Sequence, residues 1–217
     1  MAFDIHQSVV DPETGEYNEE AGIQYQEAIE ELFAQSPEAV ALSEQGTTLG
    51  WASTFLNYGM SYLGVTPAEM NDRDFDEVLF ELFPQKVAVG PEEATEIIAE
   101  LHAFWAFLGR AYGLPNAPAL LKRLDDRAAG RLERELSNPA NFGMAKSMVM
   151  QGRARDFDTS TQEGLNAWMY TYNAEQALEL GAEPAYLPPP ARKHSQATKQ
   201  KNRRKMAKAS RKQNRRR

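Results

Sequence analysis

The sequence predicts an all-α fold, and the stretch over residues 91–112 is the first observation behind that prediction. Its large apolar side chains recur at steps of three and four residues, the spacing that places them on one face of an α-helix. The members of this stripe are Ile97, Leu101, Phe104, Trp105, Leu108 and Tyr112. Other elements must cover such a face, so we expect residues 91–112 to form the central helix.

The second observation is that helix start and stop signals recur along the chain. Pro91 opens the central helix, glutamates follow in its first turns, and Gly113 with Pro115 ends it. The third is the near absence of strand patterns, since only residues 85–89 could form a strand and a lone strand has nothing to pair with. The predicted fold is therefore a single domain of seven or eight helices, packed as antiparallel hairpins because the loops are short.

Three helices are expected before residue 64. The helical pattern begins at Asn18, and Ser36 followed by Pro37 is typical of a cap and first residue of a short second helix. That helix should stop near Gly46. Apolar residues at helical spacing then predict a third helix over residues 49–63.

A short helical turn and a compact helix should connect this part to the central helix. Thr66 and Glu69 have the spacing of a capping box, which predicts the turn. The apolar helix over residues 75–83 is expected to end at Pro84, because proline disfavours helical geometry in the residue before it.

Three more helices are expected after the central one. A leucine stripe predicts a single helix over residues 117–136, with charged residues around its other sides. Asn138 and the proline after it begin the next, which runs to about residue 152. Thr159 with Gln162 offers a capping box for the last helix, which ends near Gly181.

Charge divides the chain into two contrasting parts. Residues 192–217 contain thirteen of the 24 Lys and Arg residues and no Asp or Glu, so the preceding part holds eleven basic against all 31 acidic residues. The net charge of −7 averages a body near −20 and a tail near +13. We predict a flexible arm over residues 1–17, an acidic all-α domain over 18–183, a proline-rich spacer over 184–191 and a disordered basic tail over 192–217.

Residues that would carry catalysis or bind a metal are sparse. There is no cysteine, no phosphate-binding glycine motif and no three-residue metal set among His6, His102 and His194. Two acidic groups have the oxygen ligands that Mg²⁺ or Ca²⁺ prefers, but a solvated helix face or a helix cap explains them better. They are Glu92, Glu93, Glu96 and Glu100, and Asp72, Asp74, Asp76 and Glu77. The prediction is a protein that is not an enzyme and has no cofactor or metal.

The basic tail is the candidate functional feature. Its cations are too concentrated to be the polar face of a packed helix, and against a phosphate backbone they would release condensed counterions. We predict that it binds RNA, DNA or a ribonucleoprotein without sequence preference, while the helical body offers a surface to a protein partner. The residues assigned to this site are Lys199, Lys201, Arg203, Arg204, Lys205, Lys208, Arg211, Lys212, Arg215, Arg216 and Arg217.

Rival interpretations of the tail remain open. It could clasp the acidic body of its own chain, act as a nuclear localisation signal, or bind anionic lipid, although it has few bulky apolar residues to insert into a membrane. The longest apolar run is far shorter than the roughly 20 residues that span a bilayer. With no secretory pattern at the N-terminus, we expect a cytoplasmic protein that does not bind membranes.

The remaining alternative is a helical enzyme or small-ligand binder. Its pocket would lie between the helices over residues 91–112 and 161–180, with polar groups from His102, Asn141 and Tyr172 lining it. A deep polar cavity would favour this alternative, and a filled core would favour the tether.

Overall fold

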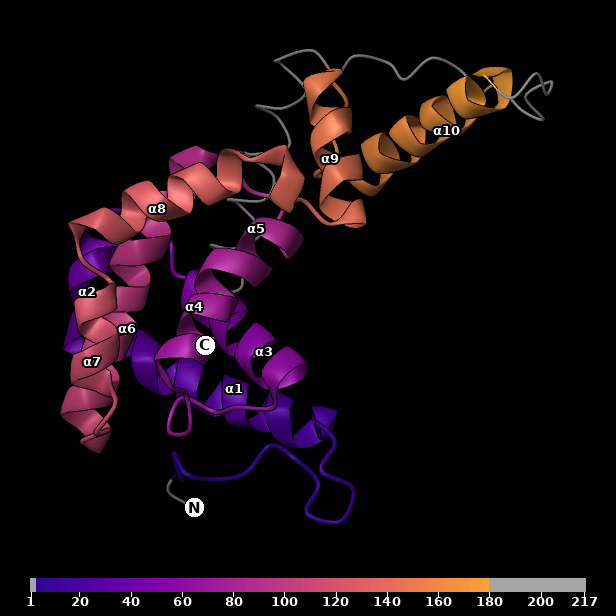
Figure 1. The fold of residues 1–217 in the computed structure, drawn as a ribbon. Helices are drawn as coiled ribbons and strands as arrows, with labels where there is room; N and C mark the ends of the chain where they lie inside the picture. The colour runs from indigo at the N-terminus through magenta and orange to yellow at the C-terminus, as the bar shows by residue number, and fades with distance from the viewer. Residues whose placement is uncertain (1–2, 180–217) are drawn as a thin grey trace, which may run out of the picture. The chain divides into compact units, whose positions relative to one another are not determined.

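The computed structural model describes residues 3–179, and these residues confirm the all-α prediction (Figure 1). Counting the continuous helical run over residues 72–86 as one, the described part contains nine helices, one more than the upper expectation. The chain forms two compact units that divide between Met148 and Val149. The end of the predicted domain, the spacer over 184–191 and the tail over 192–217 lie outside the described residues.

The first two helices of the first unit both have a side-chain cap, and the sequence predicted the second of these caps, Ser36. Asn18 accepts a hydrogen bond from the backbone N–H of Ala21 at the start of α1, and Ser36 accepts one from Ala39 at the start of α2. The helices of this unit before residue 113 are α1 (Glu19–Ala34), α2 (Pro37–Glu44), α3 (Trp51–Leu63), α4 (Asp72–Glu77), α5 (Phe83–Lys86) and α6 (Ala94–Tyr112).

The segment before α1 is packed, so the prediction of a flexible arm over 1–17 is wrong for residues 3–17. Ile5 and Val9 are buried in the core, and the hydroxyl of Tyr25 donates to the carbonyl of Ile5 at 2.9 Å. Val10 and Tyr17 form an isolated antiparallel bridge that closes the turn-rich loop between them. Few but regularly placed apolar side chains hold this segment, and its polar composition masked them.

The helical run over residues 72–86 continues through Pro84. The prediction that the helix ends at this proline is therefore wrong. A π-helical segment, Val78–Leu82, joins α4 to α5, and the N–H of Phe83 bonds back to the carbonyl of Val78. Pro84 then lies in the first turn of α5, where a proline without an N–H is tolerated. The run ends at Lys86, and the residues after it, which sequence analysis considered for a strand, form none.

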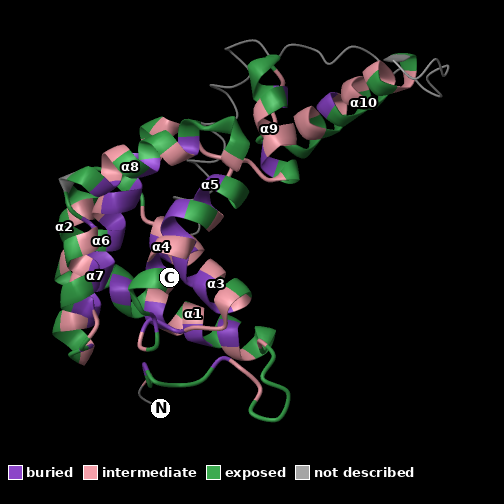
Figure 2. Cartoon of the chain, in the orientation of Figure 1, coloured by how far each residue is buried: buried purple, intermediate pink, exposed green. Residues whose placement is uncertain are grey.

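The predicted central helix, α6, is the core element of the first unit (Figure 2). Ile97, Leu101, Phe104, Trp105 and Leu108 are all fully buried, and α6 contacts α2, α3, α7 and α8. It follows a 3-10 turn at Pro91–Glu93 and ends at Gly113, whose φ of +63° favours glycine. The apolar stripe is covered in the way that its spacing predicted.

The single helix expected over residues 117–136 is instead two helices, α7 (Ala117–Arg123) and α8 (Asp126–Ser137). The chain leaves helical geometry at Leu124, and the carboxylate of Asp125 accepts hydrogen bonds from the N–H groups of Arg127 and Ala128. Asp125 is therefore an N-cap that the continuous leucine stripe concealed. A 3-10 turn, Pro139–Asn141, follows α8.

The second unit contains the end of α9 (Met144–Ala154) and α10 (Gln162–Glu179). Trp168 is fully buried between Phe157 and Tyr172, with ring centroids 5.4 Å and 5.7 Å away. A Cβ atom on Gly152 would lie 2.8 Å from the indole ring of Trp168, so only glycine allows this close approach. A small aromatic cluster thus holds the second unit together.

One buried carboxylate joins α6 to the start of α3. Gly50 has no side chain to cap α3, but Glu100, on α6 and only 1% exposed, accepts hydrogen bonds from the N–H groups of Gly50 and Ala52. The donor–acceptor distances are 2.9 to 3.0 Å. The prediction that Glu100 lies on a solvated face is therefore wrong, because this glutamate caps a different helix from the one that carries it.

Replacing Glu100 by alanine should lower the free energy of unfolding by about 2–3 kcal/mol, because two backbone N–H groups lose their acceptor in a buried place. Glu100→Gln keeps one acceptor oxygen and should cost less. Urea denaturation followed by circular dichroism measures both. Glu96→Gln, at an exposed position of the same helix, is the control, and an equal loss in the control would contradict the cap.

Candidate functional site

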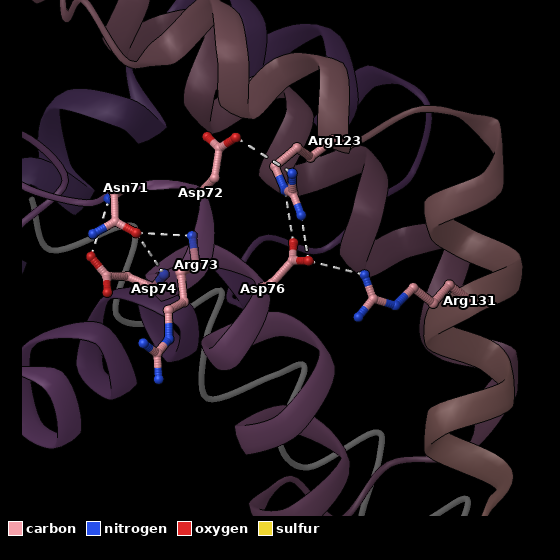
Figure 3. Close-up of polar contacts among 7 residues, drawn as sticks. All are labelled: Asn71, Asp72, Arg73, Asp74, Asp76, Arg123 and Arg131. Carbon is pink, nitrogen blue, oxygen red and sulfur yellow. Dashed lines mark hydrogen bonds and ion pairs between the residues drawn. The ribbon is translucent and has the colours of Figure 1, made fainter.

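A cluster of charged side chains lies where α4, α7 and α8 meet in the first unit (Figure 3). Asp76 is its centre: Arg123 bonds to both of its carboxylate oxygens, with Nε at 2.8 Å, and Nη1 of Arg131 lies 3.1 Å from Oδ2. Asp72 makes a longer contact of 3.5 Å with Arg123. One carboxylate therefore binds the end of α7 and the middle of α8.

A capping box fixes the start of α4 beside this cluster (Figure 3). The side chain of Asn71 accepts hydrogen bonds from the N–H groups of Arg73 and Asp74, and the carboxylate of Asp74 accepts one from the N–H of Asn71. The reciprocal bonds orient the first turn, and Asp76 follows one half-turn later. The side chain of Arg73 points away from Asp76.

Two opposing effects set the pKa of Asp76. Partial burial alone would raise it, but hydrogen bonds from Arg123 and Arg131 and their positive charges outweigh burial, so the pKa is lowered. The same pairing raises the pKa of Arg123. Asp76 is therefore ionised at neutral pH and unsuited to act as a general acid or base there.

Two adjoining hollows open around this cluster. The first has a volume of about 480 Å³ and is lined mostly by acidic groups of α4 and the π segment together with Arg73, Arg123 and Arg131. The second, about 360 Å³, lies over α7 and α8, and we call it the α7–α8 hollow. Its lining residues are Asp76, Phe80, Lys122, Arg123, Asp125, Arg127, Ala128, Arg131 and Arg134.

The cations of the α7–α8 hollow follow a helical stripe. Arg127, Arg131 and Arg134 are spaced four and three residues apart, which places them on one face of α8. The guanidinium of Arg131 lies 3.7 Å from the ring centroid of Phe80, a cation–π contact that adds to its bond with Asp76. Sequence analysis treated these arginines as the polar sides of a helix and missed the stripe, although its spacing is visible.

Lys146 is a second unusual cation. It is 1% exposed, its Nζ has no hydrogen-bond acceptor, and it lies 4.4 Å from the ring centroid of Phe142. Burial lowers its pKa to about 8, so a fraction of this lysine is neutral near physiological pH.

The structure describes only some of the residues that the sequence predicted for a functional site. The eleven tail cations, Lys199 to Arg217, and His194 lie outside the described residues. His102 is exposed on α6, the amide of Asn141 donates to Oε2 of Glu135 at 2.7 Å, and Tyr172 packs on Trp168. The ligand pocket between residues 91–112 and 161–180 stays a prediction.

Comparisons with known proteins add no family to this picture. No protein-family model, no curated protein and no solved structure matches the chain. Among the side chains that the structure describes in residues 3–179, which do not include that of Asp126, no group of three His, Cys, Asp or Glu could hold a metal ion. No helix in that range is long and apolar enough to cross a bilayer.

Asp76→Asn should destabilise the protein by about 1–2 kcal/mol at pH 7, because two arginines lose a charged acceptor. The lowered pKa means that the carboxylate stabilises the fold above the ordinary value of 3.8, and that this stabilisation is lost as pH falls below it. The variant and the natural protein should therefore converge in acid. Asp72→Asn, at a side chain 60% exposed, should change stability little in urea denaturation at either pH.

Lys146→Met should raise the free energy of unfolding at pH 7 by on the order of 1 kcal/mol, because it removes a buried charge without an acceptor. In the natural protein the folded state binds fewer protons than the unfolded state between pH 8 and 10.5, so stability rises with pH there. That rise should disappear in the variant. Lys86→Met, at an exposed lysine, should leave it in place.

Proposed function

We propose that this chain is a non-enzymatic interaction protein that binds RNA or DNA through residues 192–217. The observation that carries the proposal is the segregation of charge: thirteen Lys and Arg without one Asp or Glu follow a body with eleven basic and 31 acidic residues. Such a cationic segment attracts the phosphate backbone and releases its counterions, which gives affinity largely independent of sequence.

The composition of residues 192–217 limits how they read a nucleic acid. They contain no Phe, Tyr or Trp, so they offer no platform for base stacking. Arg and Lys with Gln, Asn and Ser between them suit contacts to phosphate oxygens along the backbone. Binding is therefore expected to depend steeply on salt and weakly on base sequence.

The helical body provides the second half of the proposal, a surface for a protein partner. On α1 the side chains of Glu20, Glu27 and Glu31 are exposed, and Ile23 among them is 49% exposed. An apolar side chain surrounded by carboxylates suits a partner with a complementary basic rim. The protein would in this way connect a nucleic acid to another protein.

Deleting residues 192–217 should abolish retention on heparin and on a mixed-sequence oligonucleotide, and leave the helical circular dichroism signal intact. In the full chain, log K should fall with log salt by nearly one unit for each phosphate that is neutralised. A shuffled tail of the same composition is the control and should bind as the natural one does. Unchanged retention after the deletion would contradict the proposal.

A different measurement tests the rival clasp, which the body's charge of about −20 favours. If residues 192–217 clasp the body, raising the salt concentration expands a compact molecule, because screening weakens the attraction between the two parts. Small-angle X-ray scattering at low and high salt reports this expansion. A radius that does not change with salt favours the tether.

A further inference from the structure

Most basic residues of the body have a partner in the structure, and those without one line two adjoining hollows. Of the eleven Lys and Arg before residue 192, seven have an ion pair, a hydrogen bond or an aromatic ring as partner. These are Lys86, Arg110, Arg123, Arg131, Lys146, Arg153 and Arg155. Within residues 3–179, four make no such contact: Arg73, Lys122, Arg127 and Arg134.

Three of these four cations line the α7–α8 hollow, and the fourth, Arg73, lines the hollow beside it. Among the described side chains, which do not include that of Asp126, the α7–α8 hollow with Arg123 and Arg131 has five cations against the carboxylates of Asp76 and Asp125. Asp76 is already shared by two arginines, and the carboxylate of Asp125 accepts hydrogen bonds from backbone N–H groups at the start of α8. A local positive excess therefore stands on a body whose net charge is near −20.

Arg134 lies in the last turn of α8, where a cation is favourable, but the spacing of the stripe adds repulsion along the helix. Like charges four residues apart on a helix repel each other, and Arg127 and Arg134 both flank Arg131 on the same face of α8. The body has many carboxylates, and another of its arginines, Arg110, forms an ion pair with Glu38. The cations of the stripe that lack a partner therefore differ from the other basic residues of the body. The stripe is arranged instead so that its charges meet at a hollow, where an anion would relieve their repulsion.

We propose that the α7–α8 hollow binds a phosphate group, through the side chains of Lys122, Arg127 and Arg134. A phosphate offers several acceptor oxygens and up to two charges, and the planar guanidinium fork matches its geometry. Apart from Phe80 and Ala128 the lining residues are charged, and five of them are cations, so the lining favours an anionic ligand. The site lies outside residues 192–217 and does not depend on the function proposed for them.

The test uses the full chain with the eleven tail cations Lys199 to Arg217 replaced by glutamine, so that tail binding cannot hide the hollow. Isothermal titration at about 50 mM salt, where screening is modest, measures binding of inorganic pyrophosphate, of a mixed-sequence DNA oligonucleotide and of poly-glutamate. Arg127→Gln and Arg134→Gln are compared one at a time with Lys86→Gln, which removes one charge from an exposed lysine elsewhere in the body.

Each arginine variant should weaken phosphate binding about fivefold or more, and the double variant more than tenfold, whereas Lys86→Gln should change it less than twofold. Loss for pyrophosphate identifies a small phosphorylated ligand as the source, and loss for the oligonucleotide alone identifies a nucleic-acid backbone. Either result supports the site. Equal affinities in all variants, no binding of either phosphate probe, or preference for poly-glutamate would overturn it, while failure of the tail proposal would appear only in the deletion experiment.

Discussion

The first unit depends on a carboxylate placed where no water can reach it. Burying Glu100 costs free energy, and three hydrogen bonds from the start of α3 offset that cost, together with the positive end of the helix dipole. Because the partners of Glu100 are backbone N–H groups, the first turn of α3 must lie next to Glu100 on α6. The apolar stripe of α6 says that other helices must cover it, and Glu100 determines where one of them starts.

Local signals made most of the helices predictable from the sequence. The helix start at Asn18 and the caps at Ser36 and Gly113 each depend on contacts within one or two turns, so the sequence alone contains those interactions. The stripe over residues 91–112 is a periodicity that the sequence shows directly. The errors arise where a distant contact or a rare geometry decides. Residues 3–17 are held by burial against α1, and Pro84 lies in a helix because a π segment precedes it.

Only part of the candidate site could be predicted from the sequence. The spacing of Arg127, Arg131 and Arg134 is a sequence property, and so is their position on one helix face. Which of them are neutralised is not, because Asp76 is 47 residues from Arg123 and 55 from Arg131. Only the fold separates cations that have a partner from those that do not, and this difference is what makes the hollow a candidate site.

Asp76 links the two helices on either side of the break at Leu124. α7 and α8 would be free to flex about that joint, but Asp76 ties Arg123 on one side of it to Arg131 on the other (Figure 3). Asp76 thereby limits the change in angle between α7 and α8 at Leu124. An anion bound at the α7–α8 hollow would contact two helices that Asp76 already links, which lowers the conformational entropy lost on binding.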